Sequence, residues 1–327
     1  MGEKEGMAVT MARRPRFGIQ LQPQRATWTD YLAAIRMVEE LGYDTLWTSD
    51  HMLPYVGPDD VPCFETWTTL AAMAMATSRV RIGALVNGVL YRDPATLAKS
   101  GVMVDQISGG RLEFALGASW AEREFRAYGL PFPPIGERLG RLDEALEIVK
   151  ALWTQHRTTF QGRYYSIEDA PCEPKPAQHP YPPIMIGGSG KTTLRIAAKH
   201  ATMWNGVGSL EKIIAPLQAL REACAAIGRD PAEIEMSAHF SLVIARTHAE
   251  AEERAKTFAR SLGVRVEDEP DFWLIGTPEE IRGQIQRYID IGVTHWIMAV
   301  GAPFDREMLA LFAHEVIPAF RVSTHER

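Results

Sequence analysis

A carboxylate and an imidazole are adjacent in the segment Ser49-Asp50-His51. Histidine titrates near neutral pH, so Asp50 and His51 are candidate catalytic residues that could donate or accept a proton. The structural alternative is that Asp50 caps a helix and that His51 follows it by chance. Position along the chain favours neither interpretation.

A glycine-rich segment, Gly187-Gly188-Ser189-Gly190, lies between an apolar run and a helical pattern that begins at Lys191. Glycines at such a place leave backbone N–H groups free to bind a phosphate, and the N-terminus of the following helix favours an anion. A nucleotide-binding P-loop would need glycine at the position of Met185, so we exclude a nucleoside triphosphatase of that type. The alternative to a phosphate site is a turn that binds nothing.

Small and polar residues also follow two other apolar runs. In Ala84-Leu85-Val86-Asn87 the small residues would let a flat ligand approach closely, and the Asn87 amide could hydrogen-bond it. The segment Ala118-Ser119-Trp120 ends in an indole that could form one wall of a site for a planar ring. For Trp120 the alternative is an aromatic residue at the rim that only packs against a helix.

The histidines and cysteines do not form a metal-binding pattern. The chain has nine histidines but no HxH or HExxH motif, so we predict no metal site and expect His239 and His295 to be packed or on the surface. The three cysteines, Cys63, Cys172 and Cys224, are widely spaced and form no CxxC pair. Such cysteines fit a reducing cytoplasm.

Eight short apolar or β-branched segments must position these residues. They alternate with helical patterns and lie at 16–21, 45–49, 80–86, 112–117, 183–187, 203–207, 235–245 and 294–300. Strands separated by helices predict parallel pairing, and eight of them predict an α/β fold, a closed (β/α)8 TIM barrel with insertions. In this fold the candidate segments would meet at the carboxyl ends of the strands.

The predicted domain organisation is a single barrel of residues 16–322 that follows a flexible N-terminal tail of residues 1–15. Residues 158–182 predict a hairpin and a proline-rich loop, and residues 262–274 predict a mobile segment. Parts of both segments, with Trp47 and Trp120, are expected to line the pocket.

Composition is that of an ordinary globular protein. The 327 residues are 46% apolar and 23% charged with a net charge of −6, which argues against a nucleic-acid partner because such a partner usually requires a basic patch. No apolar run reaches the roughly 18 residues of a membrane helix, so we expect no membrane partner.

Several blocks in order resemble the luciferase-like monooxygenase family, and within it the branch of coenzyme F420-dependent oxidoreductases. They lie at 87–94, 105–111, 117–120, 141–145, 160–165 and 182–188, and the resemblance extends over about residues 17–320. The resemblance implies an α/β barrel with a flavin or deazaflavin across its mouth and the phosphate of that cofactor on Gly187, Gly188, Ser189 and Gly190.

The resemblance also implies a non-prolyl cis peptide within Ala84-Leu85-Val86, against the cofactor ring, and an active-site acidic residue or histidine at Asp50 and His51. Two positions depart from the family. Trp120 stands where the sugar-phosphate dehydrogenase branch has a proton-donating glutamate, and Thr202-Met203 replaces an Asp-Gly pair, which we expect to change the rim of the sixth strand.

The resulting hypothesis is hydride transfer between F420 and a small organic substrate, with His51 relaying a proton. The alternatives are an FMN-dependent monooxygenase, a non-catalytic protein that binds F420 or a flavin, and a barrel enzyme for a phosphate substrate without a redox cofactor. The aromatic residues expected at the pocket point to an apolar or conjugated substrate. A homodimer is the expected assembly, because dimers are the commonest oligomers and are common in the family.

Overall fold

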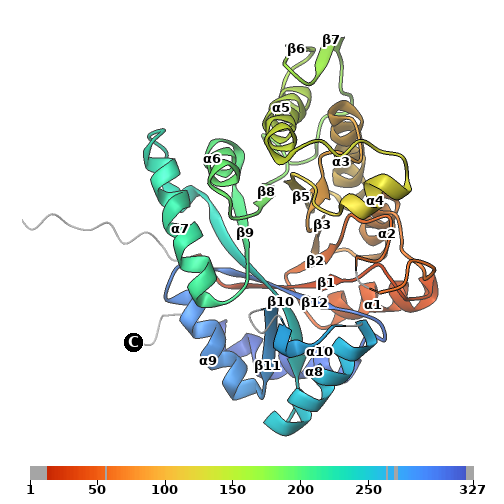
Figure 1. The fold of residues 1–327 in the computed structure, drawn as a ribbon, viewed down its shortest axis with the longest axis vertical. Helices are drawn as coiled ribbons and strands as arrows, with labels where there is room; N and C mark the ends of the chain where they lie inside the picture. The colour runs from red at the N-terminus through yellow and green to blue at the C-terminus, as the bar shows by residue number, and fades with distance from the viewer. Residues whose placement is uncertain (1–12, 56, 263, 269–271, 322–327) are drawn as a thin grey trace, which may run out of the picture.

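Eight parallel strands close into a barrel in the computed structural model, which describes residues 13–55, 57–262, 264–268 and 272–321 (Figure 1). In order around the barrel they are β1 (Arg16–Leu21), β2 (Thr45–Thr48), β3 (Arg81–Ala84), β5 (Leu112–Gly117), β8 (Ile184–Gly187), β9 (Met203–Val207), β10 (Glu235–Ile244) and β12 (His295–Val300). The last strand pairs with the first in parallel, with Arg16 opposite His295. The predicted TIM barrel is confirmed.

Helices surround the strands (Figure 1). They are α1 (Trp28–Glu40), α2 (Thr66–Ala76), α3 (Pro94–Ser108), α4 (Glu122–Ala127), α5 (Ile135–Thr154), α6 (Lys191–His200), α7 (Leu210–Ala225), α8 (His248–Leu262), α9 (Pro278–Ile289) and α10 (Arg306–Glu315), with short 3-10 turns at Pro231–Glu233, Val266–Asp268 and Ile317–Phe320. Their starts follow from local chemistry: Asp93 caps α3 before a proline at the first position, and Thr277 forms a capping box with Glu280. No described helix has both the length and the apolar character of a membrane span.

The insertions differ in part from the predictions. The hairpin predicted within residues 158–182 is confirmed: β6 (Thr158–Gln161) pairs with β7 (Ser166–Ala170), and the two project beyond α5 (Figure 1). The prediction of a mobile segment at 262–274 is wrong at its end, because β11 (Trp273–Gly276) pairs with β10. Within that segment 264–268 holds a 3-10 turn, whereas 263 and 269–271 lie outside the described residues.

The predicted third strand is divided. Strand β3 ends at Ala84, the peptide between Leu85 and Val86 is cis, and a two-residue strand, β4 (Asn87–Gly88), then pairs with β5. The cis peptide that the resemblance implied is therefore present. This break turns the chain so that Val86 and Asn87 reach the end of the barrel.

Most of the predicted tail, residues 1–12, lies outside the described residues. The part that is described contacts the barrel. Arg13 donates hydrogen bonds to the backbone carbonyls of Ala232 and Glu233, and the Arg14 guanidinium lies 3.7 Å from an Asp44 carboxylate oxygen.

A buried group of charges fills the amino-terminal end of the barrel. Arg16 Nη1 lies 2.6 Å from Glu113 Oε1, and Arg16 Nη2 lies 2.6 Å from Glu235 Oε2. Arg81 Nε donates a second bond to Glu113, at 2.8 Å. Since Glu113 is 1% exposed, its carboxylate depends on these two guanidinium groups for its stability.

An apolar layer lies between this charge group and the opposite end of the barrel. It consists of the buried residues Trp47, Ala115, Met185, Met203 and Ile297. The barrel is therefore a packed core rather than a pore, and a ligand can enter only at the carboxyl ends of the strands.

Replacing Glu113 by glutamine is expected to lower the free energy of unfolding by roughly 3 kcal/mol at neutral pH, because Arg16 and Arg81 lose a buried anionic partner. Burial alone would raise the pKa of Glu113, but Arg16 and Arg81 outweigh it and lower the pKa from 4.5 to about 2. The stabilisation is therefore complete above about pH 4.5 and is lost as the pH falls through about 2. Urea titrations from neutral pH down to about pH 2 measure the free energy of unfolding of the wild type and of Glu113→Gln. The difference between the two values should become smaller as the pH falls below about 4.5.

Glu253→Gln is the control, because Glu253 pairs with Arg260 on the surface and both side chains are largely exposed. This substitution should lower the free energy of unfolding by less than about 1 kcal/mol at any pH. A Glu113→Gln difference that stays constant over the acidic window would contradict the role given to the buried ion pairs.

Candidate active site

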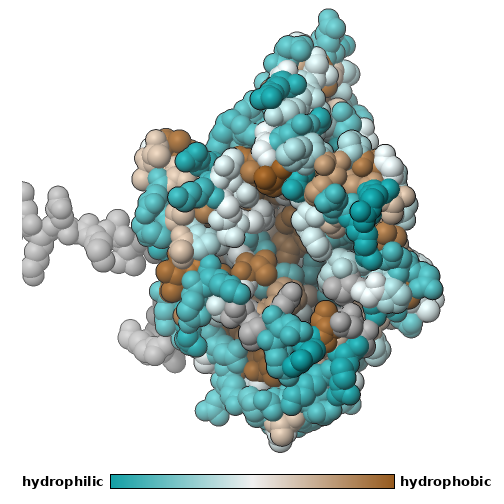
Figure 2. Space-filling model, viewed as in Figure 1, coloured by the Kyte–Doolittle hydropathy of each residue, from teal (hydrophilic) through white to brown (hydrophobic). Residues whose placement is uncertain are grey.

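A cavity of about 740 Å³ opens at the carboxyl ends of the strands, and we call it the mouth cavity. Figure 2 shows this face of the molecule hollowed near its centre, with apolar surface in and around the hollow. The predicted site residues that line the cavity are Asp50, His51, Leu85, Val86, Asn87, Ala118, Ser119, Trp120, Gly187, Gly188, Ser189 and Gly190. Ala84, by contrast, is buried and does not line the cavity.

The His51 imidazole is held by a carboxylate that the sequence did not identify. Its Nδ1 lies 2.6 Å from Oε1 of Glu124, which stands on α4 and is 1% exposed. A carboxylate accepts hydrogen bonds, so the proton of the neutral imidazole belongs on Nδ1. Nε2 then carries a lone pair, and it has no hydrogen-bond partner among the described residues.

Glu124 is itself fixed by two further donors. The backbone N–H of Met52 donates to its Oε2 at 2.8 Å, and the Tyr91 hydroxyl donates to the same oxygen at 2.9 Å. Burial would raise the pKa of Glu124, but the hydrogen bonds from His51, Met52 and Tyr91 outweigh it and the pKa is lowered. Glu124 therefore stays ionised and orients His51, as the carboxylate does in a catalytic histidine pair.

Asp50 lines the same cavity, but its carboxylate is already paired. Arg92 donates to both of its oxygens, at 2.8 and 3.1 Å, and the backbone N–H of Gly88 donates at 3.0 Å. The side chain is 3% exposed, and Arg92 also binds Glu65 at the start of α2. The geometry favours a role for Asp50 in fixing the β3–β4 turn rather than in moving a proton.

The segment after β5 brings an indole next to His51. Ser119 has a φ of +61°, which is uncommon outside glycine, and Arg138 donates to the carbonyl oxygens of Ala118 and Ser119 and holds this turn. Trp120 is 65% exposed and lies edge-on to the His51 ring, with centroids 5.4 Å apart. An indole so exposed beside a polar ring is available to contact a bound ligand.

The glycine-rich segment leads directly into α6. No side chain caps this helix, so its first N–H groups are free to face a ligand, and Lys191, Thr192 and Thr193 line the cavity beside them. Gly188 has a φ of +115°, a conformation that a residue with a side chain would adopt only under strain. The structure thus places a glycine turn, a helix N-terminus and a lysine together, as a phosphate site requires.

Two buried polar atoms of the lining residues lack partners among the described residues. They are Oδ1 of Asn87, whose amide nitrogen donates to the Ala115 carbonyl, and Oγ of Ser49. Buried polar groups are nearly always hydrogen-bonded, so each of these atoms marks a place where a ligand could supply the missing bond. Together with the glycine turn, they fit a ring system that has polar edges and carries a phosphate.

The far wall of the cavity comes from strands β1, β9 and β10 and from the residue that precedes β11. It includes Gln20, Asn205, Val207, His239 and Phe272. His239, expected in the core or on the surface, therefore faces the cavity, whereas His295 is packed with no exposed surface. This difference could not be predicted from the sequence, because neither histidine is part of a motif.

Three expectations about the pocket are wrong. Trp47 belongs to the apolar layer below the cavity, and none of residues 158–182 lines the cavity. Thr202 and Met203 stand at the amino-terminal start of β9, where Thr202 Oγ1 accepts from the Ile184 backbone N–H at 2.9 Å. They are at the opposite end of the strand from the mouth, so their departure from the family pattern does not alter its rim.

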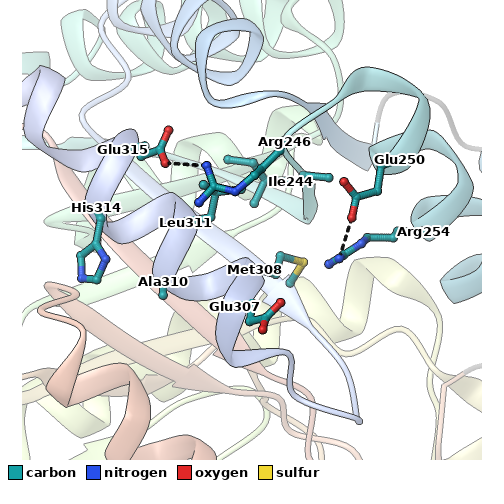
Figure 3. A pocket seen from close by; sticks show the side chains of 11 residues that line it. Ile244, Arg246, Glu250, Arg254, Glu307, Met308, Ala310, Leu311, His314 and Glu315 are labelled. Carbon is teal, nitrogen blue, oxygen red and sulfur yellow. Dashed lines mark hydrogen bonds and ion pairs between the residues drawn. The ribbon is translucent and has the colours of Figure 1, made fainter.

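A second hollow, of about 490 Å³, lies outside the barrel between the end of β10 and helices α8 and α10. Four of its charged side chains form two pairs: Arg246 with Glu315 at 3.4 Å, and Arg254 with Glu250 at 2.7 Å (Figure 3). This hollow therefore offers a ligand no free charge from these pairs.

One group of described residues, Asp143, Glu147 and His200, has the composition of a metal site. The Lys199 ammonium lies 3.1 Å from Asp143 Oδ1 and 2.5 Å from Glu147 Oε1. A cation of this chain thus neutralises both carboxylates, and we assign no metal to them.

The chain matches known proteins over most of its length. The model of the luciferase-like monooxygenase family matches residues 7–271. An F420-dependent glucose-6-phosphate dehydrogenase of Kineococcus radiotolerans is 29% identical over 311 residues, 86% of this chain and 90% of the relative. An FMNH(2)-dependent dimethylsulfone monooxygenase of Pseudomonas putida is 28% identical over 340 residues, 93% of this chain and 92% of the relative.

Solved structures agree with the fold. An F420-dependent secondary alcohol dehydrogenase, solved with an F420-acetone adduct, superposes with a TM-score of 0.83 at 21% identity. The match covers 94% of this chain and all of the other chain. At this level of identity the likeness establishes the barrel architecture.

Proposed function

The chain belongs to the luciferase-like monooxygenase family, and we propose that it is an oxidoreductase that transfers a hydride between the deazaflavin coenzyme F420 and a small organic substrate. The observation that carries the reaction is that His51, held by Glu124 at 2.6 Å, lines the same cavity as the glycine turn. Relatives named for F420 support this cofactor. FMN is the alternative, because an FMNH(2)-dependent monooxygenase is also among the relatives.

Several lining residues would hold the cofactor. Its phosphate would lie on the segment Gly187-Gly188-Ser189-Gly190 and the N-terminus of α6, beside Lys191. Asn87 and Ser49 would give their unpaired oxygens to N–H or O–H groups of the ring system. Leu85 and Val86 on one side, and Ala118 to Trp120 on the other, would bound the ring.

In this reaction the cofactor supplies the site that gives or takes a hydride, and the protein supplies position and proton transfer. His51 Nε2 would take the proton from the substrate, or return it in the reverse direction. Glu124 keeps the imidazole in the tautomer that leaves Nε2 open, and Tyr91 holds Glu124. Asp50 is proposed as a positioning residue, since its carboxylate binds Arg92 and the Gly88 N–H.

The lining of the cavity favours a neutral substrate over a sugar phosphate. Lys191 is the only lysine or arginine among the described lining residues, and it stands at the site proposed for the cofactor phosphate. Trp120, Ile135 and Val207 line the cavity, and each is more than half exposed. A substrate with apolar or conjugated surface would cover these side chains and release the water in contact with them.

Purified protein is expected to bind F420 with a dissociation constant in the micromolar range and FMN more weakly. Titrations followed by quenching of the cofactor fluorescence measure both affinities. Gly188→Val should weaken F420 binding, because valine is strained at a φ of +115° in the turn proposed to hold the phosphate. Gly136→Ala is the control, since added atoms meet nothing within 4 Å there. Tight binding of FMN without binding of F420 would overturn the proposed cofactor.

His51→Ala is expected to lower turnover by roughly 100-fold or more, the usual contribution of a general acid or base. Glu124→Gln should lower turnover by a comparable factor, because the amide oxygen must accept from the Met52 N–H, so the NH2 group donates to Nδ1 and the imidazole proton moves to Nε2. Both are measured as the rate of F420 absorbance change with a neutral alcohol or aldehyde that the wild type converts. Full turnover in His51→Ala would exclude the proton relay.

Asp50→Asn separates positioning from catalysis. It should lower the melting temperature of the protein alone by several degrees, because Arg92 loses a buried anionic partner. His51→Ala should leave that temperature nearly unchanged. If Asp50→Asn keeps the wild-type melting temperature and loses turnover, Asp50 acts in the chemistry itself.

A homodimer is the assembly we propose. Helices α2 and α3 pack together and expose Met75, Met103 and Ile107, which a second copy of the chain would cover. Light scattering is expected to give twice the chain mass for the wild type and the chain mass for Met103→Glu with Ile107→Glu. A wild-type protein of single chain mass at micromolar concentration would contradict this assembly.

A reducing cytoplasm is the compartment we propose. Cys63, Cys172 and Cys224 are free cysteines, two of them buried. Burial raises the pKa of each thiol, to about 12 for Cys63, so the three remain protonated at neutral pH and react slowly with oxidants.

A further inference from the structure

The side-chain amide of Gln20 has one orientation that satisfies its neighbours. Its Nε2 lies 3.1 Å from the Leu85 carbonyl oxygen and 3.4 Å from that of Thr48. Both partners only accept hydrogen bonds, so the NH2 group must face them and Oε1 must point away. That oxygen lies 2.9 Å from Nε2 of His239, and His239 Nε2 must therefore carry a proton.

The other ring nitrogen of His239 is consequently a bare acceptor. Burial lowers the pKa of His239 to about 4, so at neutral pH the ring has one proton, and the Gln20 contact keeps it on Nε2. Nδ1 has no hydrogen-bond partner among the described residues, although the ring lines the mouth cavity. Its neighbours there include Val207 and the Phe272 ring, 5.3 Å away edge-on, and neither side chain can donate a hydrogen bond.

We propose that His239 determines specificity by accepting a hydrogen bond at Nδ1 from a hydroxyl or amino group of the substrate. The inference rests on the proposed function, because it requires cofactor and substrate to share the mouth cavity. It narrows the substrate to a neutral, largely apolar molecule that carries an O–H or N–H donor. A half-buried acceptor left unpaired costs free energy, so an analogue without the donor would bind less well.

The two histidines of the cavity have different partners and therefore different tasks. His51 is held by the carboxylate of Glu124, which stabilises a positive ring, whereas His239 is held by the neutral amide of Gln20, which does not. His239 is thus suited to accept a hydrogen bond without taking the proton. Gln20 acts as a positioning residue that sets the His239 tautomer.

Two substitutions of His239 separate its nitrogens. His239→Asn keeps an acceptor near the position of Nδ1 and loses the donor to Gln20, whereas His239→Gln keeps a donor near Nε2 and loses the acceptor. His239→Phe keeps the ring shape and loses both. The probes are phenol with anisole, and indole with 1-methylindole, since the members of each pair differ by one methylated donor.

Binding is measured by the change in F420 fluorescence when each probe is added to the F420-loaded protein. In the wild type the donor member of each pair should bind roughly fivefold to tenfold tighter, as one hydrogen bond to a half-buried acceptor predicts. His239→Asn should keep most of this preference, and His239→Gln and His239→Phe should lose it. A preference that persists in His239→Phe, or is absent from the wild type, would overturn the proposal.

Nitrogen NMR of the His239 imidazole tests the same inference without F420 and without changing His239. We expect a protonated Nε2 and an unprotonated Nδ1 at neutral pH, and a shift of the Nδ1 signal on addition of phenol. Gln20→Leu should give a mixture of tautomers. An Nδ1–H tautomer in the wild type would refute the role of His239, whereas failure to bind F420 would refute the proposed function and leave this measurement valid.

Discussion

The buried contact between Arg16 and two glutamates is the constraint on which the rest of the barrel is built. Arg16 begins β1, and its guanidinium reaches Glu113 on β5 and Glu235 on β10, two strands that are not hydrogen-bonded to β1 in the barrel. Each glutamate would be costly to bury alone, so the three side chains can be inside only together, and they hold these strands at fixed separations. The apolar layer packs on this group, and the mouth cavity has the apolar layer as its floor.

Polar side chains at the mouth also depend on partners from other parts of the barrel. A side chain on or after one strand is hydrogen-bonded by a residue that follows a different strand. His51 after β2 is held by Glu124 on α4, Asp50 by Arg92 before α3, and Gln20 of β1 by the turn after β3. Because most of these polar side chains have hydrogen-bond partners within the protein, the few polar atoms without a partner indicate where a ligand could bind. His51 and His239, each with one unpaired ring nitrogen, and Asn87, with an unpaired oxygen, all line one cavity, where a ligand could supply the missing hydrogen bonds.

The sequence predicted what depends on local pattern. Strand periodicity located the eight barrel strands, and the glycine turn before α6 and the Asp50-His51 pair were placed at the mouth because strand ends meet there. It could not predict Glu124 as the partner of His51, since 73 residues separate them and their contact is a product of barrel closure. The expectation that Thr202-Met203 lies at the rim is wrong although the predicted strand 203–207 already begins at Met203, because the comparison with the family pattern did not take account of which end of the strand faces the mouth.

Charge is distributed unequally across the mouth, and this inequality orients an elongated ligand. At one side the uncapped N-terminus of α6 and Lys191 favour an anion. At the other side the described groups are neutral or paired: the Gln20 amide, a His239 ring that burial keeps neutral, and the apolar surfaces of Val207 and Phe272. A cofactor with a phosphate at one end would therefore bind with its ring toward His51 and Asn87, and the remaining neutral wall would be left for the substrate. Because the cofactor carries the reactive atom, a barrel with this polarity can serve different chemistries when only the side chains of the neutral wall change.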